Sequence, residues 1–166
     1  MSDSRVESLL YRFLSLDDRR DFSQAAAWEG DVGGFSCRLD GGDLKARPQD
    51  HYPNPQRARE ALEPHLRAWE LWSELENAMR IQFKYAAALV VDAASGAVNV
   101  ESVEPVAAGT TVSSGIVHVG SDSYPRPSPK ALAPSSLVEE LLGWVRELRE
   151  GRQRMLVLAY LFGSTP

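Results

Sequence analysis

The fold is decided by residues 54–92, NPQRAREALEPHLRAWELWSELENAMRIQFKYAAALVVD, because the spacing of apolar residues changes along this stretch. Leu62, Leu66 and Trp69 recur at intervals of three and four, which is typical of one face of a helix. From Met79 onward, apolar and polar residues alternate instead, which is typical of a strand with one solvated face. The stretch therefore predicts a helix that is followed directly by a strand.

The helix is predicted over residues 55–77. Asn54 is a favourable N-cap residue, and Pro55 suits the first helical position because that position needs no backbone donor. Pro64 lies inside the predicted helix and removes one intrahelical hydrogen bond. We therefore expect either a kink near Leu62 or two helices in tandem.

Strands are predicted on both sides of this helix. The strand over residues 79–92 is followed by two further strand patterns, at 98–103 and 110–119, and the short turns between them favour an antiparallel meander. Upstream, residues 35–39 and 44–47 flank an Asp-Gly-Gly-Asp sequence. Glycines supply the positive φ that tight hairpin turns need, so this pair predicts a β-hairpin.

Both ends of the chain show helical patterns. At the N-terminus the apolar residues recur at helical spacing, and Ser4 with Glu7 fits a capping box; these apolar residues are Val6, Leu9, Leu10 and Phe13. At the C-terminus a second capping box at Ser136 opens an amphipathic pattern, which the apolar run 155–162 extends. That run is compatible with either a strand or a helix, and its Leu, Met and Ala content favours the helix.

These patterns together predict an α+β fold. We expect an antiparallel sheet of about five strands, packed by two long helices, plus a short N-terminal helix. The chain of 166 residues suits one domain. Its predicted parts are an N-terminal helix (1–21), a hairpin with loops (22–54), a helix with the meander (55–120), a Pro-rich linker (121–135) and a C-terminal helix (136–163).

Composition limits the classes of function. The net charge of −5 disfavours a nucleic-acid partner, since nucleic-acid surfaces are usually basic. The longest apolar run has eight residues, against about 20 that are needed to cross a bilayer, so no membrane span is expected. The single cysteine, Cys37, rules out an internal disulfide, and the polar N-terminus predicts a cytoplasmic protein.

Few patterns in the chain indicate catalysis. His51, His65 and His118 are scattered, so neither a metal nor a cofactor is expected, and no phosphate-binding loop or nucleophile elbow occurs. One pattern, Arg59 with His65, matches the Arg-x5-His pair of helical HEPN-type ribonucleases. With 15 arginines and three histidines, however, such a match arises readily by chance.

Apolar surface is in excess on the predicted helices. Residues 155–162 are apolar all round, and a helix of that kind must be covered on all sides. We therefore expect a non-enzymatic interaction or assembly protein that self-associates, most simply as a homodimer, although one monomer could wrap the helix itself. The interface residues expected are Trp144, Met155, Leu158, Leu161 and Phe162.

Two alternatives to an interaction protein remain open at this point. A small-ligand sensor, for a nucleotide or a metabolite, would place a pocket between the sheet and three aromatic residues; these are Trp69, Trp72 and Tyr85. An RNA-cleaving nuclease would use Arg59 and His65.

Three parts of the sequence resemble a family of uncharacterised, soluble bacterial proteins. These are the stretch from Tyr52 to Glu70, the Ser-Tyr-Pro sequence at Ser123, and the Leu-Ala-Tyr sequence at Leu158. The resemblance spans residues 50–162. It implies a bacterial origin but no activity, cofactor or site residue.

Overall fold

The computed structural model describes residues 4–17, 20–92, 94–102, 119–128, 140–141, 143–145 and 147. The chain divides into two compact units, Met1–Ala133 and Pro134–Pro166. The elements of the first unit are β1 (Ser4–Ser15), β2 (Arg20–Asp21), β3 (Trp28–Val32), β4 (Phe35–Asp40), β5 (Asp43–Pro48), α1 (Pro55–Asn77), β6 (Ile81–Asp92), β7 (Val98–Ser102) and β8 (Val119–Gly120).

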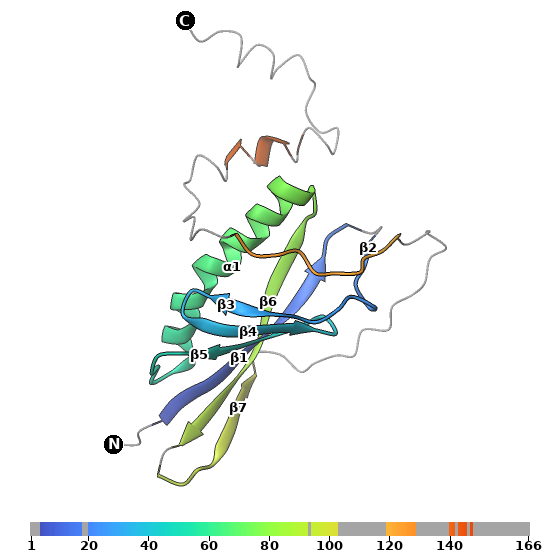
Figure 1. The fold of residues 1–166 in the computed structure, drawn as a ribbon. Coiled ribbons are helices and arrows are strands. Elements are labelled where there is room, and N and C mark those ends of the chain that lie inside the picture. The colour runs from blue at the N-terminus through green and yellow to red at the C-terminus, as the bar shows by residue number, and fades with distance from the viewer. Residues whose placement is uncertain are drawn as a thin grey trace, which may run out of the picture. The chain divides into compact units, whose positions relative to one another are not determined.

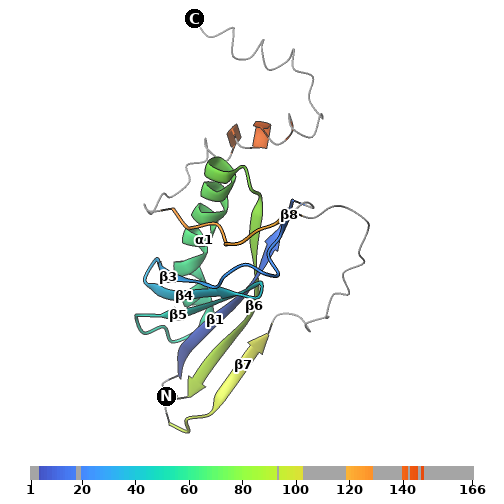
Figure 2. The same ribbon diagram turned by 45° about the vertical axis from the view of Figure 1, so that its right-hand side comes forward.

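Six of the strands form one antiparallel sheet in the order β3-β4-β5-β1-β6-β7 (Figure 1). The predicted α+β class is therefore confirmed, with six strands in the sheet where about five were expected. The predicted pairing of residues 79–92 with 98–103 is confirmed as β6 with β7. Figures 1 and 2 show β3 and β7 at opposite edges of the sheet.

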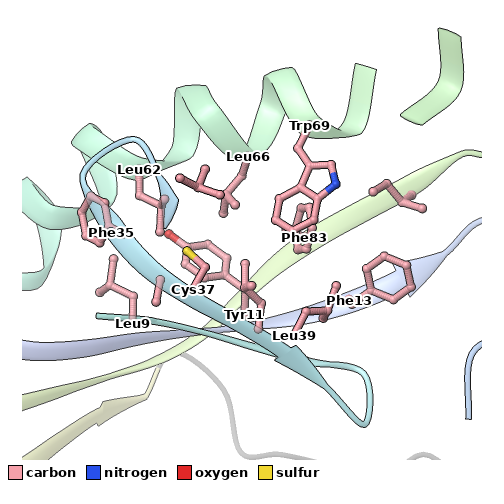
Figure 3. Close-up of a cluster of buried hydrophobic side chains, with 14 of the residues drawn as sticks. Leu9, Tyr11, Phe13, Phe35, Cys37, Leu39, Leu62, Leu66, Trp69 and Phe83 are labelled. Carbon is pink, nitrogen blue, oxygen red and sulfur yellow. The ribbon is translucent and has the colours of Figure 1, made fainter. Parts of the chain in front are cut away.

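Helix α1 covers one face of the sheet and builds the core there (Figure 3). Leu62, Leu66 and Trp69 of α1 are buried against side chains that alternate along the strands. The buried strand residues include Leu9, Tyr11, Phe13, Phe35, Cys37, Leu39 and Phe83. We call the opposite face of the sheet the outer face.

The predicted N-terminal helix is wrong, because residues 4–15 form the central strand β1. Leu9, Tyr11 and Phe13 alternate into the core, which is the strand period. A β-bulge between Val6 and Ser8 adds one residue, Glu7, to this strand. The extra residue places Val6 and Leu9, three apart, in the core together, and this spacing imitates a helix face.

Two tight hairpins join β3 to β4 and β4 to β5. The connecting pairs are Gly33-Gly34 and Gly41-Gly42, with φ of 57° and 82°, and of 57° and 83°. Positive φ at both central residues defines the type I′ turn, whose twist matches that of the flanking strands. The hairpin predicted around residues 40–43 is therefore confirmed.

Helix α1 begins and ends at the predicted residues. The Asn54 side chain accepts a hydrogen bond of 3.0 Å from the Arg57 backbone, and Pro55 opens the first turn. The helix continues through Pro64 as one element of 23 residues, so two helices in tandem do not form. Ala78 ends it in the left-handed conformation, with φ of 50°.

A second long helix is not found among the described residues, in which α1 alone is long. In the second unit, residues 140–141, 143–145 and 147 are helical. The rest of the predicted C-terminal helix over 136–163 lies outside the described residues. The strand predicted over 110–119 also lies outside them, except for Val119, which begins β8.

The described part of the predicted Pro-rich linker packs within the first unit. Strand β8 pairs in parallel with β2, and Ala26 bridges to Ser123. Tyr124 is buried, its ring stacks on Phe22 at 5.5 Å, and its hydroxyl accepts a hydrogen bond of 3.0 Å from the Gly42 backbone. Residues 119–128 therefore complete one end of the core.

Candidate functional site

Trp69 is a structural residue at the centre of the core. Its side chain is fully buried, with ring centroids 4.8 Å from Trp28 and 5.0 Å from Phe83 (Figure 3). Its indole N–H donates a hydrogen bond of 3.0 Å to the Pro125 carbonyl oxygen. This hydrogen bond therefore links residues 119–128 to α1, and the Trp69 side chain is not exposed to a ligand.

Trp72 lines a groove near the C-terminal end of α1. The groove has a volume of about 700 Å³, and its walls include Met79 and the polar residues Arg20 and Glu76. Residues 121–127 also line the groove. Trp72 and Trp69 thus lie one turn apart on α1 but in different surroundings.

Tyr85 lines a separate pocket of about 470 Å³, which lies between the N-terminal half of α1 and strands β6 and β7. The Arg59 guanidinium lies 4.1 Å above the centre of the Tyr85 ring and is ion-paired to Glu63 at 2.7 Å. Glu101 of β7 also lines the pocket. The three aromatic residues predicted as one ligand site therefore do not share a pocket.

Tyr11 packs edge-on against Tyr85, with a centroid distance of 5.4 Å. Burial of the Tyr11 hydroxyl raises its pKa above the ordinary value, and the nearby Glu63 carboxylate adds to the rise. The Arg59 guanidinium beside this hydroxyl offsets only part of the rise. The hydroxyl is therefore protonated throughout the physiological pH range.

Arg59 and His65 point to different sides of α1. Arg59 stacks on Tyr85 of β6, whereas His65 packs against the turn between β3 and β4. An added Cβ at Gly33 would overlap the His65 ring at Cδ2. Strands β3 and β6 are separated by three other strands. The pair therefore does not converge on one reacting bond, as an RNA-cleaving pair would require.

Cys37 is a core residue on β4 with 3% of its surface exposed. Burial raises the pKa of its thiol to about 12, and the Asp31 carboxylate adds to the rise. Because the thiolate is the reactive form, the native protein is expected to resist an aromatic disulfide reagent at mildly alkaline pH. The unfolded chain should react at once, and rapid stoichiometric labelling of the native protein would contradict this prediction.

The outer face of the sheet carries an apolar area over β6 and β7. Val98 and Val100 of β7 are 60% and 63% exposed, and Leu89 and Val91 of β6 are half-buried beside them. The register pairs Leu89 with Val100 and Val91 with Val98, so the four side chains lie on the same face. We call these four residues the valine patch.

The interface predicted from the sequence falls mostly outside the described residues. Met155, Leu158, Leu161 and Phe162 lie outside them. Trp144 lies among the helical residues of the second unit and is half-buried. The valine patch was not singled out from the sequence, because only the order of the strands shows that β7 lies at an edge.

The described residues contain no cluster of three or more His, Cys, Asp or Glu side chains that could hold a metal ion. No helix in this part of the chain is both long enough and apolar enough to cross a membrane.

Comparison with known proteins finds no match to a family model, to a curated protein or to a solved structure. The resemblance to a bacterial family therefore stays a prediction, and any proposal of function rests on the geometry of this chain.

Proposed function

We propose that this protein is a non-enzymatic interaction protein that associates with a second copy of itself through β7 and the valine patch. The observation that carries the proposal is the exposure of two valines, Val98 and Val100, on an edge strand of which every residue is exposed. An edge strand offers unpaired backbone donors and acceptors, and the valines offer apolar area beside them.

The two edge strands of the sheet differ in how well they are protected against pairing with another strand. Edge strand β3 carries charges that are held in place: Glu29 accepts from Arg38 at 2.8 Å, and Asp31 accepts from Gln49 at 3.0 Å. Strand β7 has neither a lysine nor a proline, which are the residues that commonly block pairing at an edge. Of the two edges, β7 is therefore the one suited to pair with another strand.

The sequence of β7 is compatible with pairing to itself. Two copies that pair antiparallel along the whole of Val98–Ser102 place Val100 opposite Val100 of the second copy. Asn99 then lies opposite Glu101, so the two acidic side chains do not face each other. Such a pair has two-fold symmetry, which is the commonest symmetry of soluble oligomers.

The alternatives have less support in the geometry. A single ligand site for Trp69, Trp72 and Tyr85 would need a shared pocket, and the three line different places. The apolar side of α1 faces the core, and Leu75 is its one large exposed hydrophobic residue. We therefore place the proposed self-association surface on the sheet; the interface residues predicted at 155–162 lie outside the described residues.

Sedimentation velocity of the full chain tests the proposal, over about a hundredfold range of micromolar concentrations. The wild-type protein is expected to shift from monomer to dimer as its concentration rises. Val100→Glu should raise the dissociation constant at least about tenfold, because it brings two carboxylates together in the pair.

The matched control is Gln82→Glu, which places the same side chain on the outer face of β6, beyond the stretch that pairs with β7. It should associate like the wild type. A wild-type protein that stays monomeric throughout, or an equal effect of the two substitutions, would overturn the proposal.

A further inference from the structure

We propose that the outer face of β4 and β5 binds a phosphate dianion, either as free phosphate or as a phosphorylated side chain. The site is a hollow of about 320 Å³ on this face. Its lining includes one hydroxyl and three cationic side chains, which are Ser36, Arg38, Lys45 and Arg47. This inference does not depend on self-association, since β4 and β5 are separated from β7 by β1 and β6.

The strand register fixes these four side chains as two neighbouring cross-strand pairs. Ser36 lies opposite Arg47, and Arg38 lies opposite Lys45. Paired Cβ atoms are about 5 Å apart, and residues two apart on one strand are about 7 Å apart. Long side chains on such a rectangle can converge on one small anion above its centre.

The charges in the hollow are only partly balanced. Arg38 is bound at 2.8 Å by both Glu29 and Asp40, so its charge is matched. Lys45 and Arg47 have no ion-pair partner in the part of the chain that the structure describes. Because two carboxylates are bound to the single Arg38, the three cations with Glu29 and Asp40 carry a net charge of +1, on a protein with a net charge of −5.

The two cations without an ion pair favour a ligand that carries two negative charges. Glu29 lines the hollow as well, but its carboxylate is ion-paired to Arg38 at 2.8 Å. Phosphate monoesters carry a charge of about −1.5 to −2 and three acceptor oxygens at neutral pH. A dianion that reaches Lys45 and Arg47 together is therefore favoured over acetate or chloride.

The test is a titration of the ¹⁵N-labelled full chain, followed by NMR, with inorganic phosphate, phosphoserine and acetate at constant ionic strength. Phosphate and phosphoserine are expected to cause saturable shifts of the β4 and β5 amides, and acetate is not. Whichever of the two binds more tightly identifies the source, a free anion or a phosphorylated side chain.

Two double variants test whether phosphate binds in the hollow. Lys45→Gln with Arg47→Gln should weaken binding at least about tenfold, since it removes both unmatched charges. Arg5→Gln with Arg57→Gln removes two exposed charges elsewhere and should bind like the wild type. Equal weakening in both variants, or no saturable shift in the wild type, would overturn the inference. The first variant should still self-associate, so the two proposals fail separately.

Discussion

Replacing Trp69 with alanine is expected to lower the free energy of unfolding by about 3–5 kcal/mol, the range for deletion of a buried tryptophan. The side chain is fully buried between Trp28 and Phe83, so its removal leaves a cavity that the sheet and α1 are too rigid to fill. It also leaves the Pro125 carbonyl without its donor. Urea unfolding, followed by far-ultraviolet circular dichroism, measures the loss.

The matched control is Trp72→Ala, one turn along the same helix. Trp72 lines an open groove and is half-buried, so its loss should cost much less, about 1 kcal/mol. Trp69→Phe keeps most of the apolar volume but removes the indole donor, and it should fall between the two. Equal losses for Trp69→Ala and Trp72→Ala would show that Trp69 does not hold the core.

Replacing Gly33 with alanine is expected to give the second large loss, about 2–5 kcal/mol. Two causes add in this substitution. A φ of 57° costs an alanine about 1–2 kcal/mol, because its Cβ crowds the following carbonyl. The new Cβ would also overlap the His65 ring at Cδ2, and such overpacking typically costs about 1–3 kcal/mol more. Thermal and urea unfolding measure the sum.

Gly41 provides the control, because it has the same φ of 57° in the next hairpin and no atom within 4 Å of an added Cβ. Gly41→Ala should therefore show the backbone cost alone. In a double-mutant cycle, His65→Ala should recover most of the difference between the two substitutions. No recovery would mean that His65 does not pack on this turn.

Local signals explain the parts of the fold that the sequence predicts well. Helix α1 starts at a proline behind an Asn cap, and the hairpin at Gly41-Gly42 has the residues that a type I′ turn requires. Strand β1 was missed because its bulge at Glu7 shifts the strand period by one residue. A bulge depends on the partner strand β6, so a local pattern does not show it.

The candidate sites could be predicted only in part, since they depend on the order and register of the strands. Trp69 and Trp72 are three residues apart on α1, and helical spacing alone did not show that the first is buried and the second lines a groove. Ser36 and Arg47 become neighbours only through the register of β4 and β5. Val100 is exposed because β7 lies at an edge of the described sheet and Val100 is on its outer face.

The most direct test of self-association through β7 is disulfide cross-linking of a Val100→Cys variant. Paired strands hold Cα atoms about 4.5–5.5 Å apart, within the range that a disulfide spans, and buried Cys37 does not compete. Mild oxidation is expected to give a covalent dimer that forms faster at higher protein concentration, whereas Gln82→Cys should stay monomeric. No dimer from Val100→Cys, or equal yields from the two variants, would contradict pairing through β7.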